Sequence, residues 1–291
     1  MLRILGIFVL ILFTIVLAVA QGRSPGEGRD DHDDKAPIQA GYGVVTPVAA
    51  ATGGTTTGLV VFETFGLRSN DGKDASQAGV LPPDLTTNAI LFVESSGRLS
   101  KNLGVAIVNP NNSNVNVTMT LRNSNGAQLG TTSVNVPSKQ QISKYVTELF
   151  SNQSSIPSDV TGTLAITSAG SSNLPVSVIG LRFRGSNFST LPATSLSGTT
   201  TPLPVIAAGV GGAGAVLLPQ FAAGGGWATE LVMANTGTST LTVRVDLFKP
   251  DGTPLTASLN GQTASSFTNL TIPPGGVLTL APRDSNGDDD F

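Results

Sequence analysis

The sequence contains no cysteine, a single histidine and few charged or aromatic side chains. Of its 291 residues, 12% are charged and 5% are aromatic. Without cysteine the chain forms neither disulfides nor thiolate metal sites. The one histidine, His32, lies in a charged segment outside any apolar stretch, so no Ser-His-Asp triad can assemble in a folded core. The sequence therefore predicts no catalytic residue, no metal site and no cofactor, which favours a protein that is not an enzyme.

Long runs of positive charge are also missing. The formal net charge is -3, and residues 36–283 hold 12 Lys and Arg against 10 Asp and Glu. Such a nearly neutral body lacks the basic surface that contacts with nucleic-acid phosphates require, so we expect no nucleic-acid partner. Most other acids lie in residues 21–40 and near the C-terminus, where residues 285–291 are interpreted as an acidic tail.

The one long hydrophobic run lies at the N-terminus. Residues 1–20 contain Arg3, then a mostly apolar run, and then Ala18-Val19-Ala20. A basic start, an apolar run and an A-x-A site are typical of a cleaved secretory signal peptide. We therefore expect a secreted or cell-surface protein whose mature chain begins at Gln21. Membrane contact is expected only if this segment stays uncleaved, which its length barely allows.

Two acidic segments offer oxygen ligands for a metal ion. Residues 21–40 place His32 among four aspartates, but ordering such a segment costs entropy, so we interpret it as a disordered acidic linker. Asp284, Asn286 and Asp288 alternate as in the opening of a calcium loop, yet the glutamate that completes such a loop does not follow. Neither segment is predicted to be a metal site.

Glycine, proline and small polar residues take the place of charge, and one stretch of the chain recurs. Residues 103–126 recur at residues 230–252 in the same register, at an offset of 126 positions, which places Asn109 on Asn235, Val117 on Val243 and Leu121 on Leu247. In each copy an apolar strand meets an Asn-led turn, and an alternating strand follows and ends at Asn-Gly or Asp-Gly. This pattern predicts half-buried β-strands with Val117, Leu121 and their equivalents in the core.

Shorter apolar segments form further predicted hairpins. Residues 41–47 with 58–65 resemble residues 162–168 with 175–184, at offsets of roughly 110 to 121, and a Leu-Pro follows each pair. A third hairpin is expected from residues 255–259 and 266–272 around Asn260-Gly261.

Residues 138–150 predict the one short helix. Ser138 and Gln141 form a capping box, and apolar residues follow at helical spacing. We expect this helix to cover an open end of the core. In the second copy, residues 273–276 (Pro-Pro-Gly-Gly) lie where the helix would begin, so strands are expected there instead.

Together these patterns predict an all-β fold of two tandem immunoglobulin-like β-sandwiches with one short helix, preceded by the signal segment. Because the link 151–161 is short, we assign residues 85–198 to a central β-sandwich and 199–284 to a second one, completed by hairpin 41–66. Completion within one chain gives a closed monomer, which effective concentration favours, and completion between chains gives a head-to-tail fibre. The alternative division is 41–160 and 161–284.

Few polar side chains stand out as candidate contacts. Arg182 and Arg184 alternate with apolar residues, which predicts that both lie on the solvent face of a strand. Trp227, the only tryptophan, follows three glycines and is the one candidate ligand contact, although covering the end of a sandwich is the favoured interpretation. Four isolated glutamates are interpreted as solvated or edge-strand charges: Glu63, Glu94, Glu148 and Glu230.

Several strings resemble repeat modules of uncharacterised secreted proteins from environmental bacteria, notably acidobacteria. They are GVAIVNPNNSNVNVTMTLRNSNG, YVTELF, VIGLRFRGSNFSTLPA and PQFAAGGGWATELVMANTG, and the likeness covers most of residues 41–283. The resemblance implies a secreted β-sandwich repeat and carries over no catalytic residue. Longer members contain more repeats than the two core copies seen here.

The predicted function is that of a secreted, non-enzymatic structural or adhesive surface module, with fibre formation by strand exchange as one form. Its expected partners are other copies, head to tail, or cell-surface or matrix components. The alternative is a carbohydrate-binding or other extracellular ligand-binding module that uses Trp227.

Overall fold

The computed structural model describes residues 41–44, 61, 63–68, 74–169, 174–195, 203–212, 214–224, 228–283 and 287. Within these residues the strands pair antiparallel, and the one helix is the single turn α2 (Val146–Leu149). The all-β prediction is thus confirmed. In this part of the chain no helix has the length and apolar character needed to cross a membrane. The predicted signal segment, the acidic linker and Trp227 lie outside the described residues.

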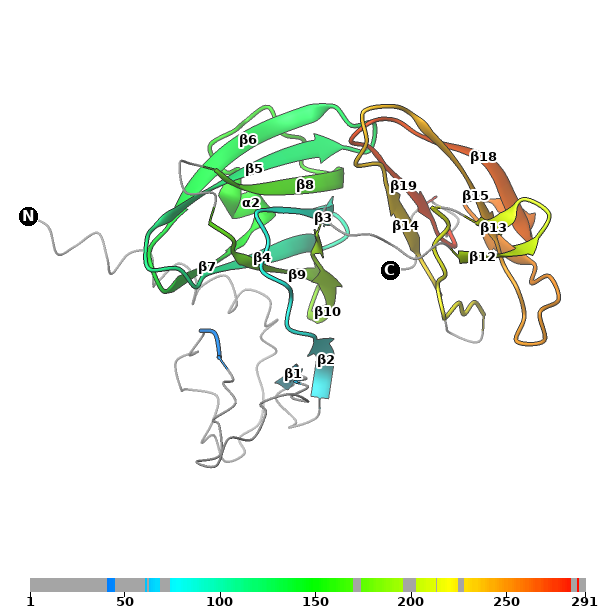
Figure 1. Ribbon diagram of the computed structural model, residues 1–291, viewed down its shortest axis with the longest axis horizontal. Coiled ribbons are helices and arrows are strands. Elements are labelled where there is room, and N and C mark those ends of the chain that lie inside the picture. The colour runs from blue at the N-terminus through cyan, green and yellow to red at the C-terminus, as the bar shows by residue number, and fades with distance from the viewer. Residues whose placement is uncertain are drawn as a thin grey trace, which may run out of the picture.

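A four-stranded and a five-stranded sheet face each other across one core (Figure 1). The first sheet has the order β10-β9-β4-β7 and the second β11-β3-β8-β5-β6. We call these nine strands the central body: β3 (Asn88–Ser95), β4 (Lys101–Asn109), β5 (Val115–Asn123), β6 (Gln128–Val136), β7 (Gln140–Tyr145), β8 (Val160–Ala169), β9 (Ser177–Arg184), β10 (Asn187–Pro192) and β11 (Thr194–Ser195).

Alternation of side chains along the strands fills this core. On β4 the residues Leu103, Val105 and Ile107 are buried and their neighbours are not, because successive strand residues point to opposite faces. The same alternation on β5 buries Val117 and Leu121, as predicted. Each such side chain stabilises the fold by roughly 1.5–3 kcal/mol relative to an exposed one.

Four later strands repeat part of this arrangement: β14 (Leu231–Ala234), β15 (Leu241–Asp246), β18 (Ser266–Ile272) and β19 (Val277–Leu280). We call them the second copy and call β4–β7 the first copy. β14 pairs with β19 as β4 pairs with β7, and Leu241 pairs with Ile272 as Val115 pairs with Val136. The second copy lies beside the central body, in yellow to red (Figure 1).

One insertion, within the second copy, distinguishes it from the first. β16 (Ala257–Leu259) and β17 (Gln262–Ala264) form a hairpin whose turn residues, Asn260 and Gly261, both have positive φ. The predicted Asn260-Gly261 turn is therefore confirmed, but its partner strand is not. Residues 266–272 form β18 and pair with β15 instead.

The predicted helix is largely wrong. Residues 140–145 form β7, which pairs with β4 so that Ile142 lies opposite Ile107, and only α2 is helical. The predicted capping box is absent, since Ser138 Oγ donates to the carbonyl of Asn111 at 2.9 Å. Pairing with the open edge of β4 outweighs a helical pattern this short. The end of the segment does cover the core, where Val146 and Phe150 are buried.

The predicted hairpin of residues 162–168 and 175–184 is also wrong. β8 lies in the five-stranded sheet and β9 in the four-stranded sheet, so the chain crosses from one layer to the other between them. Both strands have a neighbour on each side, which a two-stranded hairpin would not give them. β9 instead makes its hairpin with β10.

Two small hairpins flank these units. β1 (Glu63–Arg68) pairs with β2 (Asp74–Val80), and β12 (Leu203–Ala207) pairs with β13 (Val210–Gly212). β2 lies beside β10 of the central body, where the carbonyl of Phe188 accepts a 3.1 Å hydrogen bond from Ser76 Oγ. The division of the chain into 85–198, 199–284 and hairpin 41–66 stays a prediction.

Candidate functional site

The two copies share a buried asparagine in the same role. Asn109 and Asn235 are fully buried at the ends of β4 and β14. The amide nitrogen of Asn109 donates to the carbonyls of Ser113 at 2.8 Å and Val136 at 2.9 Å, and that of Asn235 to Ser239 at 2.8 Å and Ile272 at 2.9 Å. Each amide therefore closes the Asn-led turn and ties it to a strand of the opposite sheet.

The side-chain oxygen of each asparagine is hydrogen-bonded as well. Asn109 Oδ1 accepts from the backbone N–H of Asn111, and Asn235 Oδ1 accepts from that of Gly237, both at 2.9 Å. A buried amide with donor and acceptor both satisfied avoids the cost of an unpaired polar group. The matched pattern shows that the sequence repeat is also a repeat of contacts.

The central body and the second copy meet through two turns. The N–H of Val277 donates to the carbonyl of Ser124 at 3.0 Å, and Thr163 Oγ1 donates to the carbonyl of Gly275 at 3.3 Å. Gly126 has φ +81°, and a Cβ there would lie 1.9 Å from the carbonyl oxygen of Pro274. Glycine is thus required at this contact both for its backbone conformation and for space.

Charged side chains also link the central body to the second copy. Arg182 of β9 contacts the carboxylate of Glu94 on β3, and its Nη2 lies 2.9 Å from Glu230 Oε2 beside β14. Lys101 Nζ lies 3.4 Å from both carboxylate oxygens of Glu94. We call these four residues the charge junction. Two acids and two bases balance in it, as groups removed from water require.

The sequence-based interpretation of three residues of the charge junction is wrong. Glu94 and Glu230 were expected to be solvated, but their side chains are only 7% and 3% exposed. Arg182 was expected on a solvent face, and its side chain is 17% exposed. Of the other candidates, Glu63 is exposed, whereas Glu148 Oε2 accepts from the N–H of Tyr145 at 2.7 Å and caps α2.

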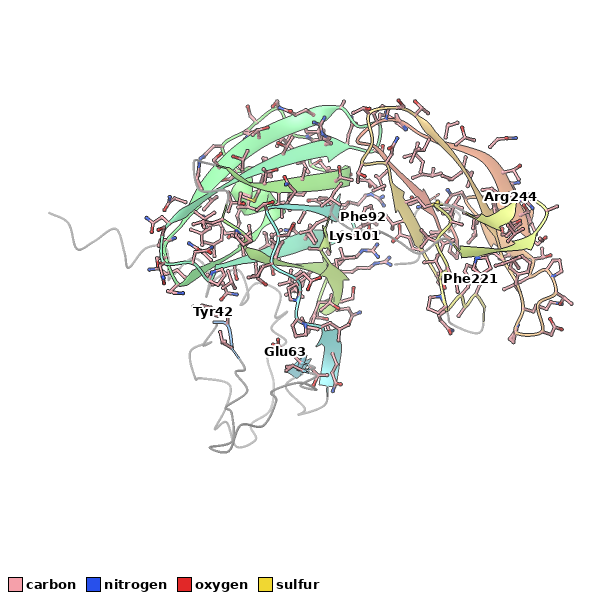
Figure 2. The ribbon with its side chains drawn as sticks, viewed as in Figure 1. Tyr42, Glu63, Phe92, Lys101, Phe221 and Arg244 are labelled. Atoms are coloured by element: carbon pink, nitrogen blue, oxygen red, sulfur yellow. The ribbon has the colours of Figure 1, made fainter. Side chains whose placement is uncertain are left out.

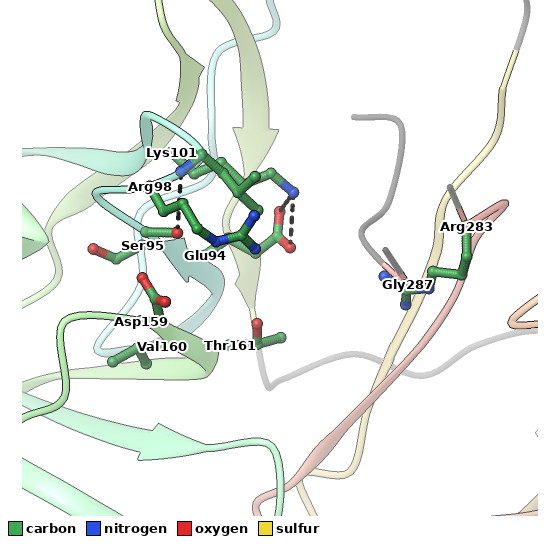
Figure 3. A pocket seen from close by; sticks show the side chains of 11 residues that line it. Glu94, Ser95, Arg98, Lys101, Asp159, Val160, Thr161, Arg283 and Gly287 are labelled. Carbon is green, nitrogen blue, oxygen red and sulfur yellow. Dashed lines mark hydrogen bonds and ion pairs between the residues drawn. The ribbon is translucent and has the colours of Figure 1, made fainter. Parts of the chain in front are cut away.

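A polar cavity of about 240 Å³ opens beside the charge junction. Glu94, Lys101 and Arg98 lie on its central-body side, and Arg283 and Gly287 face them across the opening (Figure 3). The contacts between Lys101 and Glu94 appear there as dashed lines. The cavity therefore lies where residues that follow β19 meet the central body.

The chemistry available in this cavity is ion pairing. Its carboxylates come from Glu94 and Asp159, and it has no histidine or cysteine in its lining. Within the described ranges, no group of three His, Cys, Asp or Glu is arranged to hold a metal ion. Two shifted groups lie elsewhere: burial, and then Glu148, raises the pKa of Tyr145, and a hydrogen bond from Thr253 lowers the pKa of Asp251. Tyr145 is the N-cap residue of α2, and Asp251 lies in a turn.

The second copy is much more open than the first. Its small core consists mainly of residues such as Leu231, Leu259 and Phe267, with Phe221 packed against it (Figure 2). Each of its two sheets has two strands in the described residues, so β14 and β15 each have one free edge. Unpaired strand edges and the apolar surface beside them are the second candidate site, because they can add a further strand.

Comparisons with known proteins add no family assignment. No family model, no curated protein and no solved structure matches this chain. The resemblance to secreted repeat proteins therefore stays an expectation. Trp227, the predicted ligand contact, lies outside the described residues, so its role stays a prediction as well.

Proposed function

We propose that the protein is a secreted, non-enzymatic structural or adhesive module of the cell surface, built from immunoglobulin-like β-sandwich repeats. The observation that carries this proposal is the pair of matched copies, each closed by the same buried asparagine and joined by the charge junction. Repeated units with fixed contacts between neighbours suit extended surface proteins. Its partners are other copies of the chain or components of the cell surface and matrix.

Strand neighbours support the immunoglobulin-like description. In the immunoglobulin sheets ABED and CFG, strand B lies next to E and C next to F. If β4, β5, β7 and β8 are taken as B, C, E and F, the pairs β4–β7 and β5–β8 match these neighbours. The outer strands differ, since β3 lies next to β8 and β9 next to β4. The central body is thus a relative of that architecture with its first and last strands exchanged.

The buried charges support a structural role over a catalytic one. Glu94 lies between Lys101 and Arg182, so its carboxylate is engaged in ion pairs with two cations. The polar side chains of the junction therefore hold two units together. A screen of hydrolase substrates that found turnover abolished by E94Q would contradict this part of the proposal.

Export and assembly are tested on the secreted protein. We expect its intact mass to correspond to a chain that starts at Gln21, and negative-stain images to show rods or filaments. An intact mass that includes residues 1–20 would contradict cleavage. Loss of tryptophan fluorescence on titration with a glycan, together with isolated compact particles in the images, would favour the alternative of carbohydrate binding through Trp227.

A further inference from the structure

Among the described residues, the second copy lacks the two strand neighbours that complete the first. In the central body β5 lies between β6 and β8, and β4 lies between β7 and β9. In the second copy β15 is paired with β18 and β14 with β19, and the described residues supply no further strand to either. The missing neighbours are the equivalents of β8 and β9, one for each sheet.

Apolar side chains are exposed along these edges as a result. Leu241 at the start of β15 is 46% exposed, whereas Val115 at the same place in β5 is 3% exposed. Val117 is fully buried, but its equivalent Val243 is only half-buried. The register is the same in both copies as far as Val117 and Val243, so the difference at these positions lies in what covers the strands.

The segment before β14 also pairs with no strand in the part of the chain that the structure describes. Residues 214–221 are the repeat equivalent of β3 at the 126-residue offset, and they form no strand. In the central body β3 pairs with β8. Leu217 is 62% exposed, whereas its equivalent Leu91 in β3 is buried. Val216 and Leu218 are 81% and 57% exposed, and their equivalents Ile90 and Phe92 are half-buried. One missing strand, the equivalent of β8, explains this exposure and the free edge of β15 together.

The sequence that matches the missing strands lies near the N-terminus. Residues 41–47 resemble residues 162–168 of β8, and residues 58–65 resemble residues 175–184, which include all of β9. The described part of this region contacts the central body of its own chain. Tyr42 Oη donates to the carbonyl of Lys139 at 3.0 Å, and residues 63–65 pair with β2 as part of β1, beside β10 (Figure 2). Donation of residues 41–65 to another molecule would exchange these contacts for contacts with the second copy.

We propose that the open edges of the second copy bind residues 41–65 of another molecule of this chain, which adds one strand beside β15 and one beside β14. The inference rests on the proposed function and names its partner and its contact surface. Because β8 and β9 lie in different sheets, the two donated segments enter different sheets. In the donor chain, its own central body comes after residues 41–65 in the sequence. The donor's central body would therefore lie next to the second copy of the acceptor molecule. Such a contact joins two different surfaces, so it repeats into an open head-to-tail filament.

Cross-linking tests this contact, because the chain has no cysteine of its own. Thr120 of β5 lies opposite Ala165 of β8, and their repeat equivalents are Asp246 and Val44. A mixture of the D246C and V44C proteins should form a disulfide-linked heterodimer under mild oxidation. The double variant should form a ladder of covalent multimers. V45C and T46C are tested in the same way, so that a register shifted by one or two residues is also detected.

The matched control places the cysteine on the first copy. T120C mixed with V44C should give no heterodimer, because β8 already occupies that edge. If D246C perturbs the fold, T242C with V48C repeats the test at the other end of β15. A double variant that closes into a cross-linked monomer at every protein concentration would overturn the proposal in favour of the chain's own hairpin. Absence of any D246C or T242C product would overturn it as well.

The outcomes separate this inference from the function on which it rests. Filaments in the images with no reactive cysteine pair would leave the structural role standing and remove residues 41–65 as the donor. A secreted protein that neither assembles nor associates with cells or matrix would remove the proposed function itself.

Discussion

The two copies of the repeat have the same buried asparagine and the same strand register as far as Val117 and Val243, yet they differ sharply in burial. β5 alternates between buried and more exposed residues along its length, whereas β15 is exposed or half-buried at every position. Local sequence is matched, so the difference comes from the neighbours: β8 and β9 pair with β5 and β4, whereas no described strand pairs with the second edge of β15 or β14. The repeat pattern thus specifies strands and turns, while completion of the core depends on segments elsewhere in the chain.

The largest expected effect comes from charging the core of the first copy. V117D should lower the free energy of unfolding by about 4 kcal/mol, because an unpaired carboxylate cannot be solvated there. V243D should cost about half as much in dilute protein, since Val243 is only half-buried. Chemical denaturation measures both. T118D serves as the control, because Thr118 bonds Ser133 on the exposed face, and a T118D effect larger than that of V117D would mean a register error of one residue.

Removing the buried asparagine ranks next. N109A leaves the carbonyls of Ser113, Val136 and Pro137 without their donor and should cost about 3 kcal/mol. N235A leaves only those of Ser239 and Ile272 and should cost about 2 kcal/mol. Thermal melts of the two variants compare them. A harmless N109A would contradict the role assigned to this contact.

The charge junction should have an intermediate effect on stability and a clear effect on rigidity. R182M removes the cation beside Glu94 and Glu230 and should cost about 2 kcal/mol. Limited proteolysis should then cut between the central body and the second copy sooner than in the parent protein. R184M on the same strand is the control. Equal protease resistance in R182M and the parent would show that the ion pairs do not hold the junction.

The smallest expected effect is a difference in stability between alanine variants of two matched glycines. Gly126 and Gly252 have nearly the same φ, +81° and +82°, so alanine costs about 1 kcal/mol of backbone strain at each. Only at Gly126 does the added Cβ meet another group, the carbonyl of Pro274. G126A should therefore be about 1 kcal/mol more destabilising than G252A. Equal costs would mean that the turn contact at the junction is loose.

Sequence patterns predicted the repeated strand pairs β4 and β5, and β14 and β15, because apolar alternation and Asn-led turns are local signals. The helical stripe of residues 138–150 failed because β4 offered an open edge, which sequence periodicity does not report. A signal for the strand was present: Lys139, with φ +57°, is the equivalent of Gly275, with φ +68°, once the copies are aligned at Val136 and Ile272. The two glycines of residues 273–276 thus mark the same turn in both copies.

The charge junction could not be predicted from the sequence. Glu94, Lys101, Arg182 and Glu230 come from four separate segments, and each looks like an ordinary surface charge among its own neighbours. Only the packing of β9 between the first copy and the start of β14 brings them together. The same holds for the free edges, which follow from sheet order and not from the composition of any strand.

Hydrogen exchange of backbone amides, measured by mass spectrometry at low and high protein concentration, tests the central claim most directly. Peptides covering β4 and β5 should be protected at both concentrations, because their edges are paired within the chain. Peptides covering β14, β15 and residues 214–221 should exchange quickly in dilute protein and become protected as concentration rises. Equal, concentration-independent protection of both copies would contradict the account, because the second copy would then be complete within one chain.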